Sequence, residues 1–92
     1  MNYQPLYMPP VTKAIKSGKV TLLPGEDVGE HVTDKREEII VVIDGRASLA
    51  IDGKEVKISR GSAYFVGEGK THNVFNRTKR PLEYIYITSI VC

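Results

Sequence analysis

The stretch of sequence that decides the fold reads GEDVGEHVTDKREEIIVVIDG and occupies residues 25–45. Its second half contains a short apolar run, 39–43, which ends at Asp44-Gly45, and a second Asp-Gly pair follows at Asp52-Gly53. Asp-Gly is a strong turn signal because both residues tolerate a positive φ angle. The spacing therefore predicts three consecutive strands, 37–43, 46–51 and 54–59, that form a meander.

Short apolar or alternating runs continue on both sides of these three strands. No window sustains the three-to-four-residue spacing of an amphipathic helix. Further strands are predicted at 63–66, 71–76 and 82–91, and two candidates, 11–16 and 20–23, precede the segment around His31. Many short strands separated by turn residues are typical of a closed barrel or jelly roll. We therefore predict an all-β protein.

The amino-terminal part of the chain is rich in proline. Four of the five prolines, Pro5, Pro9, Pro10 and Pro24, lie in the first 24 residues. Proline fixes φ and lacks an amide proton, which favours extended structure and turns. We expect a single domain over 1–92, in which residues 1–19 form an extended arm with the first strand and residues 20–91 form the barrel.

Charge and composition exclude several classes of protein. Thirteen basic and 11 acidic side chains give a net charge of +2 without a basic stripe, which argues against a nucleic-acid partner. The longest apolar run, 39–43, is far too short to cross a membrane, and the amino terminus has no secretory signal, so we expect a cytoplasmic protein. Cys92 is the only cysteine and cannot form an internal disulfide, so stability must come from burial, a metal or an oligomer.

Two histidines, His31 and His72, are the only ones in the chain, and each lies in a predicted strand or strand edge near glycine turns. Strands that pair inside a barrel can bring residues this far apart into contact. Histidine together with a carboxylate is the usual ligand set for a first-row transition metal. The two histidines are therefore candidate metal ligands, and the alternative is a pair of hydrogen-bonded barrel histidines.

Two spaced motifs resemble those of the cupin superfamily, in its small, single-domain cupin 2 form. Their matching positions are Gly25, His31, Thr33, Glu38 and Gly45 in the first motif, and Gly61, Gly67, Gly69, His72 and Asn76 in the second. The resemblance implies a double-stranded β-helix, or jelly-roll barrel, with metal ligands at His31, Glu38 and His72. Thr33 stands where the family has a second histidine, so it would be a weak ligand or a hydrogen-bond partner of one. Gly67 replaces a proline of the family motif.

Glu37 competes with Glu38 for the carboxylate role, because the family tolerates either spacing. Alternation along a strand sends Glu38, Ile40 and Val42 to one face and Glu37 to the other. A glutamate among inward aliphatic residues needs a partner, which a metal or a histidine would supply. We therefore favour Glu38.

The resemblance implies a divalent metal, iron, manganese, nickel or zinc, and a small polar ligand such as a sugar, a keto acid or a related carboxylate. Isomerisation, decarboxylation or dioxygenation would be the reactions, and no catalytic residue is assigned. The alternative is a non-catalytic ligand-binding or dimeric structural module with a degenerate metal site.

Other residues are candidates for supporting roles. Tyr84 and Tyr86 share a strand face and could line the cavity mouth, although core or interface packing is the simpler interpretation. The cationic run Arg77, Lys79, Arg80 could attract an anionic substrate, or it could be an ordinary solvated loop. We expect a homodimer that pairs through sheet edges, with the arm covering the partner's edge strand.

Overall fold

The two Asp-Gly pairs make different connections in the computed structural model, which describes residues 1–92. β5 (Arg46–Ile51) and β6 (Lys54–Ser59) form a hairpin across Asp52-Gly53, whose φ angles are 47° and 83°. β4 (Arg36–Asp44) does not pair with β5, because Gly45 leads the chain from one sheet to the other. The predicted meander is therefore wrong at its first turn: a positive φ fixes a turn but not which strands pair.

Glycine is needed at position 45 for its positive φ angle of 86°, and also because there is no room for a side chain. A Cβ atom at this position would lie 2.6 Å from the carbonyl oxygen of Pro81, just before β9. Such a contact is well inside van der Waals range, so no other residue lets the chain change sheets so close to that backbone.

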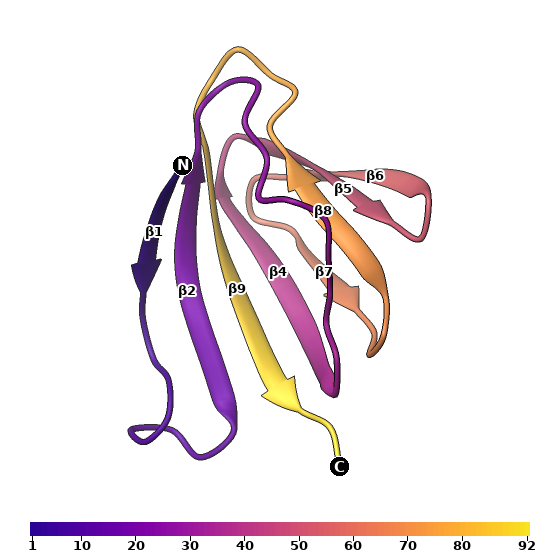
Figure 1. The fold of residues 1–92 in the computed structure, drawn as a ribbon. Helices are drawn as coiled ribbons and strands as arrows, with labels where there is room; N and C mark the ends of the chain where they lie inside the picture. The colour runs from indigo at the N-terminus through magenta and orange to yellow at the C-terminus, as the bar shows by residue number, and fades with distance from the viewer.

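Nine strands form two antiparallel sheets and no helix is present (Figure 1). The five-stranded sheet has the order β1-β2-β9-β4-β7, and the four-stranded sheet has the order β3-β8-β5-β6. The remaining strands are β1 (Asn2–Pro5), β2 (Ile15–Leu22), β3 (His31–Val32), β7 (Ala63–Val66), β8 (Thr71–Phe75) and β9 (Leu82–Ile90). Two facing antiparallel sheets confirm the all-β jelly-roll barrel. No helix is long and apolar enough to cross a membrane.

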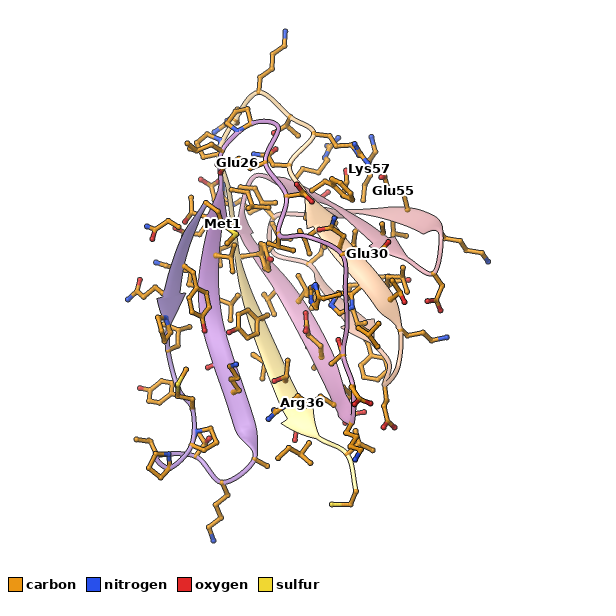
Figure 2. The ribbon with its side chains drawn as sticks, in the orientation of Figure 1. Met1, Glu26, Glu30, Arg36, Glu55 and Lys57 are labelled. Atoms are coloured by element: carbon orange, nitrogen blue, oxygen red, sulfur yellow. The ribbon has the colours of Figure 1, made fainter.

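The amino-terminal segment differs from the expected arm. One strand, β2, replaces the two predicted at 11–16 and 20–23, and β1 pairs with it in register Asn2 to Thr21. The arm thus covers an edge of its own sheet, and β1 becomes the new edge strand. The amino group of Met1 also donates to Glu26 at 2.8 Å, and both residues lie at the same end of the barrel (Figure 2).

Eleven buried apolar residues form the core between the two sheets. Leu22, Leu49 and Leu82 are completely buried within it. Along β4 the inward positions are Glu38, Ile40 and Val42, and all three are buried. Ile40 and Val42 belong to the apolar core, whereas Glu38, two residues earlier on the same face, lies outside it. The core therefore ends at Ile40 and a polar site begins at Glu38.

Candidate metal centre and ligand cavity

The pairing of β3 with β8 brings the two histidines together. His31 lies directly opposite His72 in the register, and their ring centroids are 4.1 Å apart with the planes tilted by 58°. Residues directly opposite on antiparallel strands have neighbouring side chains. The short strand β3 therefore brings together the two histidines, which are far apart in the sequence.

Both imidazole rings are oriented by the same local contact. Nδ1 of His31 lies 2.9 Å from the carbonyl oxygen of Gly29, and Nδ1 of His72 lies 3.2 Å from that of Lys70. A carbonyl can only accept, so each Nδ1 donates its proton and each neutral ring keeps a lone pair on Nε2. A carbonyl that fixes the tautomer in this way is a common feature of metal-binding histidines.

Glu38 from β4 completes a three-residue cluster. Its Oε2 lies 3.6 Å from Nε2 of His72, and the nitrogen and oxygen atoms that His31, Glu38 and His72 offer all lie within 4.8 Å of one another. Glu37 is exposed on the opposite face of the strand. The structure thus places Glu38, and not Glu37, beside the histidines.

His72 is electrostatically coupled to Glu38. Burial is the largest influence on the pKa of His72 and lowers it, but the contacts with Glu38 and the Lys70 carbonyl outweigh burial and leave the pKa raised. The Nε2 atom itself is buried and has no hydrogen-bond partner. A buried ring nitrogen that has no hydrogen-bond partner and faces a carboxylate fits a cation that both groups could share.

Thr33 is buried beside the same histidine. Its hydroxyl lies 3.4 Å from Nδ1 of His72, whereas Glu38 lies beside Nε2. The hydroxyl therefore contacts the ring nitrogen that already faces the Lys70 carbonyl. The threonine side chain therefore supports His72 through this nitrogen.

A cavity of about 460 Å³ opens beside the cluster. Tyr84 and Tyr86 both line it, and burial raises the pKa of each phenol above its ordinary value, so both are neutral hydroxyls at physiological pH. The hydroxyl of Tyr86 lies 2.6 Å from that of Tyr3, and the two rings stack. Sequence reasoning missed Tyr3, because no local pattern shows that β1 folds back over the cavity.

Two cationic side chains also line this cavity, Lys16 from β2 and Arg36 from the start of β4. Arg36 is half-buried, and its guanidinium donates to Oγ1 of Thr88 at 3.3 Å (Figure 2 labels Arg36). Sequence reasoning did not select either residue. Strand alternation alone could have placed Arg36 on the inward face with Glu38.

The geometry agrees with the comparisons to known proteins. The sequence profile of the family described as "Cupin domain" matches residues 18–88, most of the chain. The chain belongs to the cupin family. In this cupin, Glu38 and His72 are buried, and the exposed His31 lies beside them at the edge of the cluster.

Individual relatives are moderately similar. TcmJ, a tetracenomycin polyketide synthase protein of Streptomyces glaucescens, is 32% identical over 69 residues, which are 75% of this chain and 46% of that protein. An oxalate-binding protein of Thermotoga maritima is 29% identical over 75 residues, 82% of this chain and 62% of that protein. The cupin chain thus spans about half of the first relative and less than two thirds of the second.

A solved structure supports the fold over the whole chain. The Cupin_2 domain of an XRE-family transcriptional regulator from Enterobacter cloacae matches with a TM-score of 0.88 and 22% identity, and the match covers 99% of this chain and 97% of that domain. At this identity the match shows a shared fold alone.

Proposed function

We propose that this cupin binds one divalent metal ion, iron, manganese, nickel or zinc, through His31, Glu38 and His72, together with a small polar ligand. The observation that carries the proposal is the buried Nε2 of His72, which has no hydrogen-bond partner and lies 3.6 Å from the Glu38 carboxylate. Leaving a buried polar group unsatisfied costs about 1–3 kcal/mol. A metal ion would satisfy this nitrogen and the carboxylate at once.

The donor set suits such an ion. Two imidazoles and one carboxylate are the ligands of the facial triads that hold non-haem iron, and they also suit manganese, nickel and zinc. Bound there, the ion would supply Lewis-acid polarisation of an oxygen atom of the ligand. The Gly29 and Lys70 carbonyls keep both Nε2 lone pairs available by holding the proton on Nδ1.

The rest of the cavity favours a carboxylate among the candidate ligands. Lys16 and Arg36 place two positive charges on the lining, and the neutral Tyr84 and Tyr86 hydroxyls can donate hydrogen bonds. One relative bears the name oxalate-binding protein, which agrees with this charge pattern. A keto acid or another small carboxylate is therefore our first choice, ahead of a neutral sugar.

Binding without turnover is the role we favour, and isomerisation, decarboxylation and dioxygenation are the reactions to screen. If His31 and Glu38 serve the metal, the remaining carboxylate of the lining is the exposed Asp34. General acid–base catalysis is most effective when the pKa of the catalytic group lies near the working pH. The raised pKa values of Tyr84 and Tyr86 lie far above neutral pH, so neither phenol suits that role.

Metal content of protein purified without an affinity tag tests the proposal. We expect near-stoichiometric metal in the wild type, loss of most of it in Glu38→Gln, and wild-type content in the matched control Glu37→Gln, whose side chain is exposed on the other face. Bound metal should also raise the melting temperature of the wild type and of Glu37→Gln, but not that of Glu38→Gln. Equal metal in both variants, or a wild type that takes up none of the four metals, would refute the site.

We further propose that the protein is a homodimer, joined through the outer face of the five-stranded sheet. Ile39 pairs with Phe65 on one side and Ile87 on the other, and Val41 pairs with Ile85, so apolar side chains adjoin across three strands. Phe65 is 57% exposed and Ile39 is 43% exposed. Contiguous apolar surface of this kind is typical of interfaces, and a twofold contact would cover it on both copies. Sedimentation of the wild type and of Phe65→Glu tests it: a wild-type monomer at micromolar concentration would refute the dimer.

A further inference from the structure

A second pocket, of about 360 Å³, lies where three connections between strands meet, and it shares no residue with the metal cavity. Its lining is entirely polar or glycine and consists of Asp44, Gly45, Arg46, Ser59, Arg60, Thr78 and Arg80. The contributing segments are the β4–β5 turn, the β6–β7 turn and the loop between β8 and β9, which is at the top of Figure 1.

Backbone contacts hold all three segments in place. Gly45 packs against the Pro81 carbonyl, and the amide of Gly61 donates to the carbonyl of Val42 at 2.8 Å. The buried Asn76 fixes the β8–β9 loop, since its side-chain amide donates to the carbonyl of Arg80 at 2.7 Å and its oxygen accepts from the amide of Thr78 at 3.0 Å. The pocket is therefore a preformed part of the fold.

The charges in this pocket are not compensated within the chain. Three of the five arginines of the protein line it, and none of the three forms an ion pair. By contrast, Arg77 in the same loop pairs with Glu55 of β6 at 2.8 Å (Figure 2 labels Glu55). The one carboxylate of the lining, Asp44, accepts a hydrogen bond from the amide of Gly45 at 3.1 Å and pairs with no arginine.

Three guanidinium groups around a polar hollow define the ligand by its chemistry. Arginine stays charged at every physiological pH, and its planar fork matches the oxygens of phosphate with two parallel hydrogen bonds. The hydroxyl of Ser59 makes no hydrogen bond within the chain and is a further donor, whereas that of Thr78 is already used on Asn76 or Arg80. A concave site of this size suits a small molecule better than a duplex or a membrane, which need an extended basic surface.

We propose that this second pocket binds the phosphate or sulfate group of a small molecule through Arg46, Arg60 and Arg80. The site is separate from the metal centre and does not depend on it. The chain would thus carry two ligand sites, one inside the barrel and one between its turns.

Amide chemical shifts at low ionic strength test the proposal, with inorganic phosphate, ribose 5-phosphate and sodium chloride as probes. We expect the two phosphate probes to shift amides of residues 44–46, 59–60 and 78–80, and chloride at equal ionic strength to leave them unchanged. Arg60→Gln and Arg80→Gln should each weaken phosphate binding about ten-fold, from the usual strength of a hydrogen bond to a charged group.

Three controls give each result a single meaning. Lys79→Gln removes the same charge from the same loop at a residue outside the lining, so it should bind phosphate as the wild type does. Glu38→Gln alters the metal site and should also leave phosphate binding intact, which separates this proposal from the metal site. Thermal unfolding of each variant shows that it is folded.

Other outcomes would overturn the assignment. If Lys79→Gln lost as much phosphate affinity as the arginine variants, the protein would have only a diffuse positive field. Amide shifts spread over all surface lysines would show the same. Binding of an oligonucleotide or a polyglutamate peptide far more tightly than ribose 5-phosphate would show a polyanion surface instead. If phosphate shifts none of these amides, the pocket is not an anion site.

Discussion

Replacing Gly18 with alanine should destabilise the protein by crowding two tyrosine rings. Gly18 lies in the middle of β2, where a Cβ atom would be 2.7 Å from Cε1 of Tyr3, and 2.8 and 2.9 Å from Cε1 and the hydroxyl oxygen of Tyr86. Carbon atoms in contact normally lie about 3.5–4.0 Å apart. The rings must therefore each move by roughly 1 Å, which would disturb the 2.6 Å contact between their hydroxyls.

The expected magnitude follows from two opposing terms. Overpacking of this kind costs about 1–3 kcal/mol. Alanine recovers about 0.4–1 kcal/mol, since it restricts the unfolded chain more than glycine does. The net loss should be about 1–2 kcal/mol, which in a chain of this length lowers Tm by roughly 5–15 °C.

Thermal and urea unfolding measures this loss of stability. The four variants to compare are Gly18→Ala, Gly67→Ala, Tyr3→Ala and the double variant that combines Tyr3→Ala with Gly18→Ala. Gly67→Ala is the matched control, because its nearest neighbour would lie 3.8 Å away and its backbone is not left-handed, so its Tm should stay at or above the wild-type value. Tyr3→Ala vacates space beside Gly18, and in that background Gly18→Ala should cost measurably less. If Gly18→Ala is as stable as the wild type, or costs the same with and without Tyr3, the crowding argument fails.

Two further substitutions test the site and the loop that borders the second pocket. Thr33→His should tighten metal binding roughly ten-fold, because position 33 lines the metal cavity beside His72. Competition with a chelator measures this affinity. Unchanged affinity would mean that an imidazole at position 33 does not reach the ion. Asn76→Ala should lower the free energy of unfolding by about 2–4 kcal/mol, because it removes a buried amide that donates to two carbonyls at 2.9 and 2.7 Å. A loss in urea unfolding well below this range would show that water replaces these bonds.

The choice between Glu37 and Glu38 could be made from the sequence because it depends on local periodicity. A strand alternates with a period of two, and Ile40 and Val42 fix which face is inward. The meeting of His31 with His72 is different, since it depends on the register between strands far apart in the chain. Only the spacing of the two family motifs, and no local pattern, pointed to that contact.

The amino-terminal strands could not be predicted, because a contact distant in sequence decides them. A glycine between apolar runs predicts a break, and the two expected strands end on either side of Gly18. In the structure β2 runs through this glycine without interruption. The position is occupied by glycine because the stacked rings of Tyr3 and Tyr86 lie over it, and Tyr86 follows it by 68 positions in the sequence.

The cationic run before β9 shows why neighbours in a loop need not share a role. Arg77 pairs with Glu55 and covers the ring of Phe75 at 4.2 Å, so it belongs to the surface of the four-stranded sheet. Arg80, three residues later, lines the second pocket with Arg46, which comes from another connection. Side chains in a turn diverge, and the carbonyl of Arg80 is fixed by a buried asparagine instead of by its charged neighbours. The proposed anion site therefore depends on the packing of three connections between strands. Of its three arginines, only Arg80 lies in the cationic run that the sequence shows.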